Sequence, residues 1–247
     1  MTMTSPKSPT PPDRAHYAFI CAMPMEIVPL VEALTLTETT VNGVTAHAGT
    51  LGNRDVVAIV TGMGTELATA GTERLLDAVA VGHVVVVGIT GAVDNETPIG
   101  TLVLPEVVVH SVTGTEHRPT SLGDGTPHGK MWTGDVLITD LDVIAELRAR
   151  GVVSLDMETA AIAVLCEARG IPWSVFRVIS DRATDGSDDE DVFHMSNQDG
   201  TPNHEAIARY FEEHPDRLEI MARLAEGATL AARTAAEAAI RACSQSR

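Results

Sequence analysis

Three acidic residues of the chain are placed where a carboxylate could take part in chemistry. Glu26 lies near the start of a predicted helix, and Asp181 follows a predicted central strand at residues 173–179. Glu158 lies in a largely apolar predicted helix at residues 157–169. When carboxyl groups share a pocket, burial and mutual repulsion raise the pKa of one, which can then donate a proton while another stays ionised. If the three residues meet in one cleft, the predicted chemistry is acid–base catalysis.

Each of these three residues also has a purely structural interpretation. A glutamate at a helix start, such as Glu26, interacts favourably with the helix dipole. An aspartate after a strand, such as Asp181, commonly caps a turn or a helix. Glu158 either faces solvent or enters a pocket, and both alternatives are compatible with the sequence.

A glycine-rich turn at residues 61–68 follows a predicted strand and precedes a predicted helix, in a pattern similar to a dinucleotide-binding fingerprint. Such a turn could place an anion or a ribose against the N–H groups of the helix N-terminus. A nicotinamide-binding protein would also have an acidic residue at the end of the next strand, but that strand ends in Gly88, Ile89 and Thr90. The sequence therefore predicts no cofactor, and a tight structural turn is the alternative.

Three other kinds of site find no support in the sequence. The nine histidines form no His-x-x-x-His pair and no cluster with cysteine, so no metal site is predicted. The acidic run at residues 185–191 lacks the alternate spacing and final glutamate of a calcium-binding loop, and a solvated, mobile loop is predicted instead. Ser180 lacks the flanking glycines of a nucleophile elbow, which argues against a Ser-His-Asp site.

Strands and helices alternate along the chain, which is typical of an α/β fold. Predicted strands lie at residues 18–22, 41–50, 55–61, 83–87, 101–110 and 173–179. Predicted helices lie at residues 25–34, 66–79, 141–150, 157–169, 203–213 and 216–242, and residues 111–130 form a predicted loop. We therefore predict a single α/β domain with a mixed central sheet flanked by helices. Ligands of such folds bind at the carboxyl ends of the strands.

The composition disfavours two classes of partner. The 247 residues include 34 Asp and Glu against 17 Lys and Arg, which gives a formal net charge of −17. Nucleic-acid binding needs clustered basic residues, and binding to an anionic membrane surface needs the same, so neither partner is expected. The apolar runs have the length of strands, so no membrane-spanning segment is expected either.

The N-terminal residues 1–16 are rich in Ser, Thr and Pro and lack the apolar core of a secretory signal. We predict a disordered tail there and a folded domain over residues 17–247. Cys21, Cys166 and Cys243 are scattered through apolar or helical stretches, which indicates reduced thiols in a cytoplasmic protein.

Five segments at the predicted strand ends and helix starts resemble the nucleoside phosphorylase/nucleosidase superfamily. They are Ala22-Met23-Pro24-Met25-Glu26, Thr61-Gly62-Met63-Gly64, Val87-Gly88-Ile89-Thr90-Gly91-Ala92, Asp156-Met157-Glu158-Thr159-Ala160-Ala161-Ile162-Ala163 and Arg177-Val178-Ile179-Ser180-Asp181. Within that superfamily the sequence is most similar to the 5′-methylthioadenosine/S-adenosylhomocysteine nucleosidases. The order and spacing of the segments agree from about Tyr17 to the C-terminal helices.

This resemblance implies cleavage of the N-glycosidic bond of a purine nucleoside. It implies that Glu26 orients and activates a water and that Asp181 protonates the departing purine. It also implies that Glu158 binds the ribose hydroxyls, with Met157 packed against the sugar. The transition state resembles an oxocarbenium ion, so nearby carboxylates stabilise it and an acid beside N7 helps the purine to leave. The resemblance also suggests a homodimer, and the further substrate contacts that it implies are Gly64, Thr90, Leu137, Ile138 and Ser180.

Phosphorolysis is the alternative to hydrolysis within this superfamily. The resemblance implies that phosphorolytic members hold phosphate with arginines at the first strand end and just before the glycine turn of the third strand. This chain has Glu26 and the apolar residues 84–87 at those places. A carboxylate where phosphate would bind repels it, which favours water as the nucleophile.

The chain departs from the resemblance in three places. Ile89 replaces the serine of the family's glycine turn, with a hydroxyl moved to Thr90, and Leu137 replaces a phenylalanine that stacks on the base. Residues 111–132 are shorter than the segment that in the family helps to build the pocket for the 5′ substituent and the dimer contact. The sequence therefore does not identify which nucleoside is cleaved, and a futalosine-type nucleoside is one alternative. A protein that binds a nucleoside without efficient catalysis is a further alternative.

Overall fold

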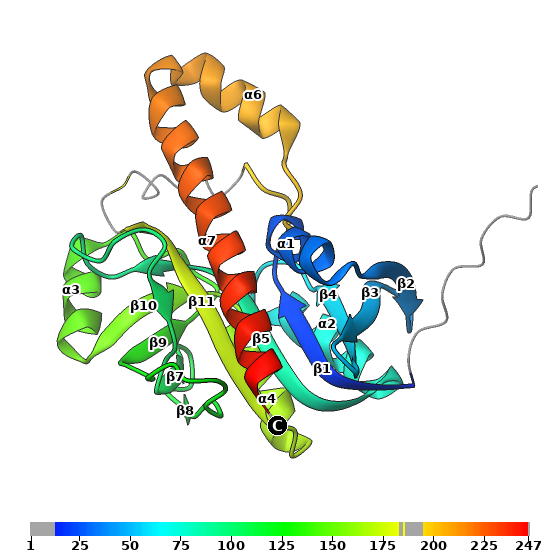
Figure 1. The fold of residues 1–247 in the computed structure, drawn as a ribbon. Helices are drawn as coiled ribbons and strands as arrows, with labels where there is room; N and C mark the ends of the chain where they lie inside the picture. The colour runs from blue at the N-terminus through cyan, green and yellow to red at the C-terminus, as the bar shows by residue number, and fades with distance from the viewer. Residues whose placement is uncertain (1–12, 183–184, 186–194, 247) are drawn as a thin grey trace, which may run out of the picture.

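A mixed sheet of eleven strands forms the centre of the computed structural model, which describes residues 13–182, 185 and 195–246 (Figure 1). The strands are β1 (Arg14–Cys21), β2 (Thr37–Val41), β3 (Val44–Leu51), β4 (Arg54–Val60), β5 (Ala80–Ala92), β6 (Leu102–Val103), β7 (Val107–His110), β8 (Glu116–His117), β9 (Lys130–Thr133), β10 (Val152–Asp156) and β11 (Trp173–Arg182). The helices are α1 (Pro24–Leu34), α2 (Thr65–Ala78), α3 (Leu141–Ala149), α4 (Thr159–Ala168), α6 (His204–Glu213), the 3₁₀ helix η1 (Pro215–Arg217) and α7 (Leu218–Gln245). The predicted α/β domain with a mixed central sheet is confirmed.

The strand β5 lies at the centre of the sheet and is buried on both faces. It pairs in parallel with β1 and β11, and its end pairs in antiparallel with β10. Val84 and Val86 belong to the core that includes residues of α2 and α4. Val85 and Val87 belong to the core that includes residues of α1 and α7. A strand covered by helices on both faces needs a continuous apolar run, which explains the sequence of β5.

The strand β5 extends beyond the strand predicted at residues 83–87. Its last residues stay paired with β11, with Gly88 opposite Arg177 and Gly91 opposite Asp181. Because of this pairing, β11 also continues past its predicted end and contains Asp181 itself. The turn expected at these glycines is therefore part of the sheet.

Three further boundaries differ from the sequence prediction. The strand predicted at residues 41–50 is a hairpin of β2 and β3, because Asn42 and Gly43 both adopt the positive φ of a two-residue hairpin turn. The strand predicted at residues 101–110 is divided into β6 and β7 by a proline, which has no N–H for a sheet. The loop predicted at residues 111–130 contains β8 and the first residue of β9.

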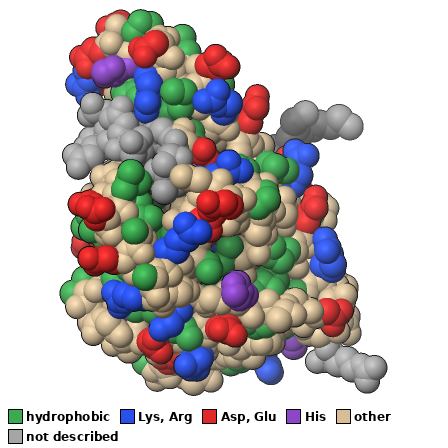
Figure 2. Space-filling view, turned by 90° about the vertical axis from the view of Figure 1, so that its left-hand side faces the viewer, with side chains coloured by type: hydrophobic (Ala, Val, Ile, Leu, Met, Phe, Trp, Pro, Cys, Tyr) green, Lys and Arg blue, Asp and Glu red, His purple; other side chains and the backbone are tan. Residues whose placement is uncertain are grey.

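The chain becomes regular before the predicted domain start at Tyr17, because β1 begins at Arg14 and Ala15 is fully buried. Most of the predicted tail, residues 1–12, and most of the acidic run at residues 185–191 lie outside the described residues. No helix in the described part of the chain is long and apolar enough to cross a membrane. Acidic and basic side chains are interspersed over the face that Figure 2 shows.

The C-terminal end of α7 is held to the sheet by side chains of β1 and β4. Arg54 donates from Nη1 to the carbonyl of Cys243 at 2.8 Å and from Nη2 to the carbonyl of Ser246. The hydroxyl of Tyr17 also donates to the carbonyl of Cys243, at 3.3 Å. These donors satisfy carbonyls that the helix end leaves without intrahelical partners. They fix the lower half of a helix whose upper half, together with α6, projects beyond the sheet (Figure 1).

Replacing Arg54 with alanine should therefore lower the free energy of unfolding by about 1–3 kcal/mol, because two partly buried carbonyls lose a charged donor. Urea unfolding of the two proteins measures this difference. Arg223→Ala is the matched control: Arg223 makes an exposed pair with Glu219 at 3.7 Å, and its loss should change stability by less than about 0.5 kcal/mol. Equal effects of the two substitutions would contradict the role given to Arg54.

Candidate active site

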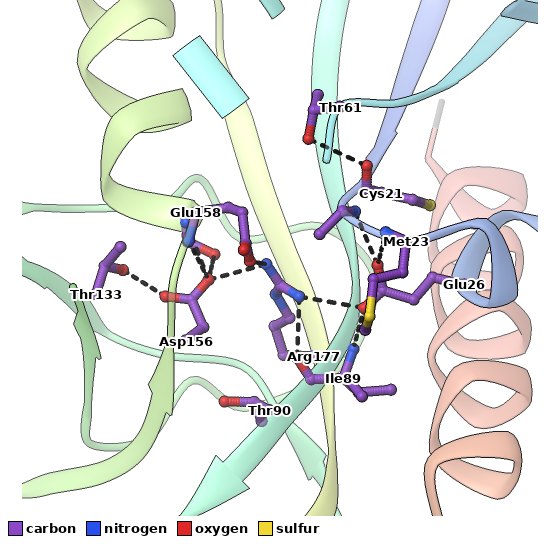
Figure 3. Close-up of polar contacts among 12 residues, drawn as sticks. Cys21, Met23, Glu26, Thr61, Ile89, Thr90, Thr133, Asp156, Glu158 and Arg177 are labelled. Carbon is purple, nitrogen blue, oxygen red and sulfur yellow. Dashed lines mark hydrogen bonds and ion pairs between the residues drawn. The ribbon is translucent and has the colours of Figure 1, made fainter. Parts of the chain in front are cut away.

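Segments at the ends of several strands bring Glu26, Asp156, Glu158 and Arg177 close together (Figure 3). Glu26 lies in α1 directly after β1, and Gly64 follows β4. Asp156 is the last residue of β10. Arg177 and Asp181 both lie on β11, opposite residues at the end of β5.

The carboxylate of Glu26 is completely buried and is held by backbone N–H groups from two strand ends. Its Oε2 accepts from the N–H groups of Ala22 at 2.8 Å and Met23 at 2.9 Å, as in one half of a capping box. Its Oε1 accepts from the N–H of Ile89 on β5, at 2.8 Å. Gly88 makes room for this carboxylate, because a Cβ there would lie 2.2 Å from Oε1. A glycine is therefore required at this position, because the carboxylate of Glu26 lies so close to the backbone of β5.

The guanidinium of Arg177 joins three buried carboxylates (Figure 3). Nη2 lies 2.9 Å from Oδ2 of Asp156 and 2.9 Å from Oε2 of Glu158. Nη1 lies 3.4 Å from Oε1 of Glu26 and donates to the carbonyl of Ile89 at 2.9 Å. The side chain of Arg177 is only 2% exposed. The buried cluster therefore contains three acidic side chains and one basic side chain. Burial lowers the pKa of Arg177, but the three neighbouring acids outweigh this and raise the pKa above its ordinary value, so the guanidinium stays charged.

Glu158 enters the site and does not face solvent. Its Oε1 accepts from the N–H of Gly64 at 2.9 Å, and its Oε2 pairs with Arg177. Burial, together with the charges of Asp156 and Glu26, raises the pKa of Glu158 to about 7, although Arg177 and the Gly64 N–H oppose the shift. At this raised pKa, Glu158 is protonated in part of the molecules near neutral pH.

Asp156 fixes the start of the helix that follows it. Its carboxylate accepts from the N–H and the hydroxyl of Thr159, the first residue of α4, and from the hydroxyl of Thr133 on β9. These bonds satisfy donors at the N-terminus of α4, which starts at Thr159, two residues later than the helix predicted from the sequence. Asp156 thereby places Glu158, which immediately precedes that helix.

Asp181 lies on the wall shared by two cavities. The hydroxyl of Ser180 donates to its Oδ1 at 2.6 Å, so Ser180 orients Asp181. The first cavity, of about 170 Å³, is lined by Asp181 together with Met157, Leu137 and Ile138 among others. The second cavity, of about 400 Å³, also includes Asp181 and Leu137. Its apolar lining consists of Met23, Met63, Ile89, Met195, Leu224, Ala225 and Ala228.

Two of the residues predicted to contact substrate also make structural contacts within the protein. The hydroxyl of Thr90 is buried and donates to the carbonyl of Leu155 at 2.7 Å, which ties β5 to β10. The N–H of Gly64 is bound to Glu158. Each therefore acts on the site through a neighbour, and a direct contact of either with substrate stays a prediction.

The sequence interpretation missed Arg177 and Asp156. Arg177 is the single charged residue in the strand predicted at residues 173–179, and a charge in a buried strand needs partners. That signal was present, but the partners depend on the pairing of β10 and β11 with β5. Asp156 is followed three residues later by a threonine at a helix start, which is the spacing of a local cap.

The fold and the strand-end motifs agree with a comparison against known families. The model of the phosphorylase superfamily matches residues 16–131 and 120–213 of the chain. The chain belongs to the phosphorylase superfamily. The motifs from Ala22 to Asp181 all lie within the matched residues, so the cluster around Arg177 occupies the part of the chain that defines this superfamily membership.

Similar curated proteins and solved structures of the superfamily have related names. A 5′-methylthioadenosine/S-adenosylhomocysteine nucleosidase of Colwellia psychrerythraea is 30% identical over 200 residues, which are 66% of this chain and 82% of the relative. The same-named protein of Chromohalobacter salexigens is 29% identical over 69% of this chain and 86% of the relative. A Neisseria meningitidis nucleosidase of that name, solved with methylthio-immucillin-A, has a TM-score of 0.69 at 20% identity, covering 94% of this chain and 100% of that chain. Futalosine hydrolase of Helicobacter pylori also has a TM-score of 0.69, at 16% identity, with 94% and 98% covered.

The pKa of Glu158 makes a testable contribution to stability. The ordinary pKa of glutamate is 4.5 and that of folded Glu158 is about 7, so between these pH values the folded protein binds more protons than the unfolded protein. The stability contributed by Glu158 should therefore fall as pH rises from about 4.5 to about 7. The unfolding free energy of the wild type minus that of Glu158→Gln, measured by urea titration, should decrease across this window by more than about 1 kcal/mol. Parallel pH profiles of the two proteins would contradict the raised pKa.

Proposed function

We propose that the chain hydrolyses the N-glycosidic bond of a purine nucleoside, releasing the free base and a ribose derivative. The names of the similar proteins support a substrate of the methylthioadenosine and S-adenosylhomocysteine class. The observation that carries the proposal is the position of Glu26. Its carboxylate accepts hydrogen bonds from three backbone N–H groups and lies next to Arg177.

This position of Glu26 supports water over phosphate as the nucleophile. Converging backbone N–H groups beside a guanidinium are the donors that bind an oxyanion. In this chain they are already bound to a side-chain carboxylate, so a phosphate would have to displace Glu26. Phosphate would also meet the charges of Asp156 and Glu158, which share the same guanidinium. A neutral water faces neither obstacle.

The cavities suggest how a nucleoside binds. The purine would lie in the cavity beside Leu137 and Ile138, where Asp181 can reach it. The ribose would lie between Met157 and Glu158, and the 5′ substituent would extend into the second, apolar cavity. Asp181 belongs to both cavities and is therefore next to the bond that joins base and sugar.

The proposed mechanism divides the chemistry among these carboxyl groups. Asp181 protonates the departing purine, which leaves poorly as an anion. The excess negative charge around Arg177 stabilises the positive charge that develops on the sugar. Glu26 orients and deprotonates the water. Its contact with Arg177 is the longest of its four, at 3.4 Å.

A cytoplasmic homodimer is the proposed form of the protein. Val136 lines the first cavity, Leu141 begins the helix α3 that contributes Ile144 to it, and the two apolar side chains are 77% and 58% exposed. A second copy covering them would exclude water from the site. Sedimentation equilibrium of the purified chain measures the mass directly, and a monomer at micromolar concentration would exclude this arrangement.

A nucleoside panel with product identification tests the reaction. Methylthioadenosine, S-adenosylhomocysteine, futalosine and inosine are each incubated with and without phosphate, and base and sugar products are separated. We expect free base and free sugar at a rate that is independent of phosphate, and we expect Glu26→Gln to lose about 10²–10⁴-fold in rate. A sugar 1-phosphate would show phosphorolysis, and no product from any nucleoside would leave the nucleoside-binding alternative.

Asp181→Asn tests the proton donor. The amide retains the shape of the side chain but cannot supply the proton, so kcat should fall by about 10²–10⁴-fold while KM changes little. Asp77→Asn is the control, because Asp77 is half-exposed and pairs with Arg169 at 2.7 Å, away from both cavities. Wild-type turnover by Asp181→Asn would exclude the assigned role.

A further inference from the structure

The loop between β9 and α3 is joined to the start of α2 by a side chain that the reaction does not use. Oδ1 of Asp135 accepts from the N–H of Thr65 at 2.6 Å, and Oδ2 accepts from the hydroxyl of Thr65 at 2.6 Å. Thr65 is the first residue of α2. A residue 70 positions away in sequence therefore uses both of its carboxylate oxygens to accept hydrogen bonds from the first residue of this helix.

The two segments that Asp135 joins have different tasks in the site. Next to Asp135, Leu137 and Ile138 form part of the wall of the first cavity. Next to Thr65, the N–H of Gly64 holds Glu158 at 2.9 Å. The link therefore connects the wall proposed to contact the purine with the turn that holds the carboxylate proposed to contact the ribose.

The glycine at the start of α2 leaves space for the carboxylate of Asp135. Helix α2 has Gly64 at its N-cap position, so the cap that a side chain there would supply is missing. Gly64 adopts a φ of +92°, and a Cβ there would lie 3.1 Å from Oδ1 of Asp135. A glycine at this position therefore admits the carboxylate from the distant loop, where another residue would crowd it.

We propose that Asp135 is a positioning residue that sets the purine-binding wall at a fixed distance from the ribose-binding Glu158. The inference rests on the proposed nucleoside function. Without the link, the loop that carries Leu137 and Ile138 loses these two hydrogen bonds to α2, and the wall is less well placed for the base. Glu158 still has Arg177 at 2.9 Å, so the sugar half of the site keeps its main support.

Binding of the two product halves separates this role from a general structural one. Isothermal titration of adenine and of 5-methylthioribose is measured for the wild type, Asp135→Ala, Thr65→Val and Thr65→Ser. Loss of a helix cap of ordinary strength predicts that Asp135→Ala binds adenine about three- to tenfold more weakly. The affinity for 5-methylthioribose should stay within about twofold. Thr65→Val, which loses one of the two hydrogen bonds, should be intermediate, and Thr65→Ser should restore wild-type binding.

Asn203→Ala is the matched control for loss of a helix cap. The side chain of Asn203 accepts from the N–H of Ala206 at the start of α6, a helix that is absent from the described lining of both cavities. This variant should lower the melting temperature without changing adenine affinity. The inference is overturned if Asp135→Ala lowers the melting temperature but binds adenine as the wild type does, or if both ligands weaken equally.

Steady-state kinetics of the same variants separate this inference from the proposed function. We expect KM for methylthioadenosine to rise in Asp135→Ala by the same factor as the adenine dissociation constant, with kcat changed less than twofold. A wild type that binds adenine but hydrolyses no nucleoside would contradict the proposed function and leave the link intact. If the wild type hydrolyses the nucleoside and Asp135→Ala has an unchanged KM, the result would contradict the positioning role of Asp135 but not the proposed function.

Discussion

The contact of Arg177 with three buried carboxylates is the interaction on which the rest of the site depends. A carboxylate taken out of water without a partner destabilises a protein by several kcal/mol, so Glu26, Asp156 and Glu158 could not all be buried without this guanidinium. One positive charge still leaves the cluster negative when more than one acid is ionised. The raised pKa of Glu158 reflects that imbalance. The same imbalance would stabilise a cationic sugar in the transition state, so an arrangement that is costly for folding is useful for the proposed chemistry.

The sheet is built to admit this cluster. Arg177 projects from β11, which pairs with the central strand β5 along most of its length, so the guanidinium is fixed by the most buried part of the fold. Gly88 on β5 leaves the space that the carboxylate of Glu26 fills. The N–H of Ile89, one residue further, donates to that carboxylate. The apolar core therefore determines much of the geometry of the polar site, because Arg177 and the N–H of Ile89 belong to neighbouring strands that are packed against the core.

Local sequence patterns predicted the class of fold, the apolar central strand and the three acidic candidates, because helix and strand periods and strand-end motifs are local signals. The same reasoning placed the end of β5 too early. Glycines 88 and 91 are typical of a turn, but pairing with Arg177 and Asp181 on β11 keeps them extended. Whether Glu158 faced solvent could not be decided for the same reason, since its partners Gly64 and Arg177 come from distant strands. The short hairpin at Asn42 and Gly43 was a readable local signal, because this dipeptide favours the required turn.

Three helix N-termini at the site are occupied by carboxylates of the chain itself. Glu26 lies at the start of α1, Asp135 binds the first residue of α2, and Asp156 binds the first residue of α4. Helix N-termini are where proteins bind external anions such as phosphate, because free N–H groups and the helix dipole favour negative charge there. With these donors bound to acids of the chain itself, an anionic nucleophile such as phosphate would find them occupied, which agrees with the neutral nucleophile of the proposed function. The excess of acidic residues in the sequence therefore matters at these few positions, where each acid takes donors that a phosphate would need.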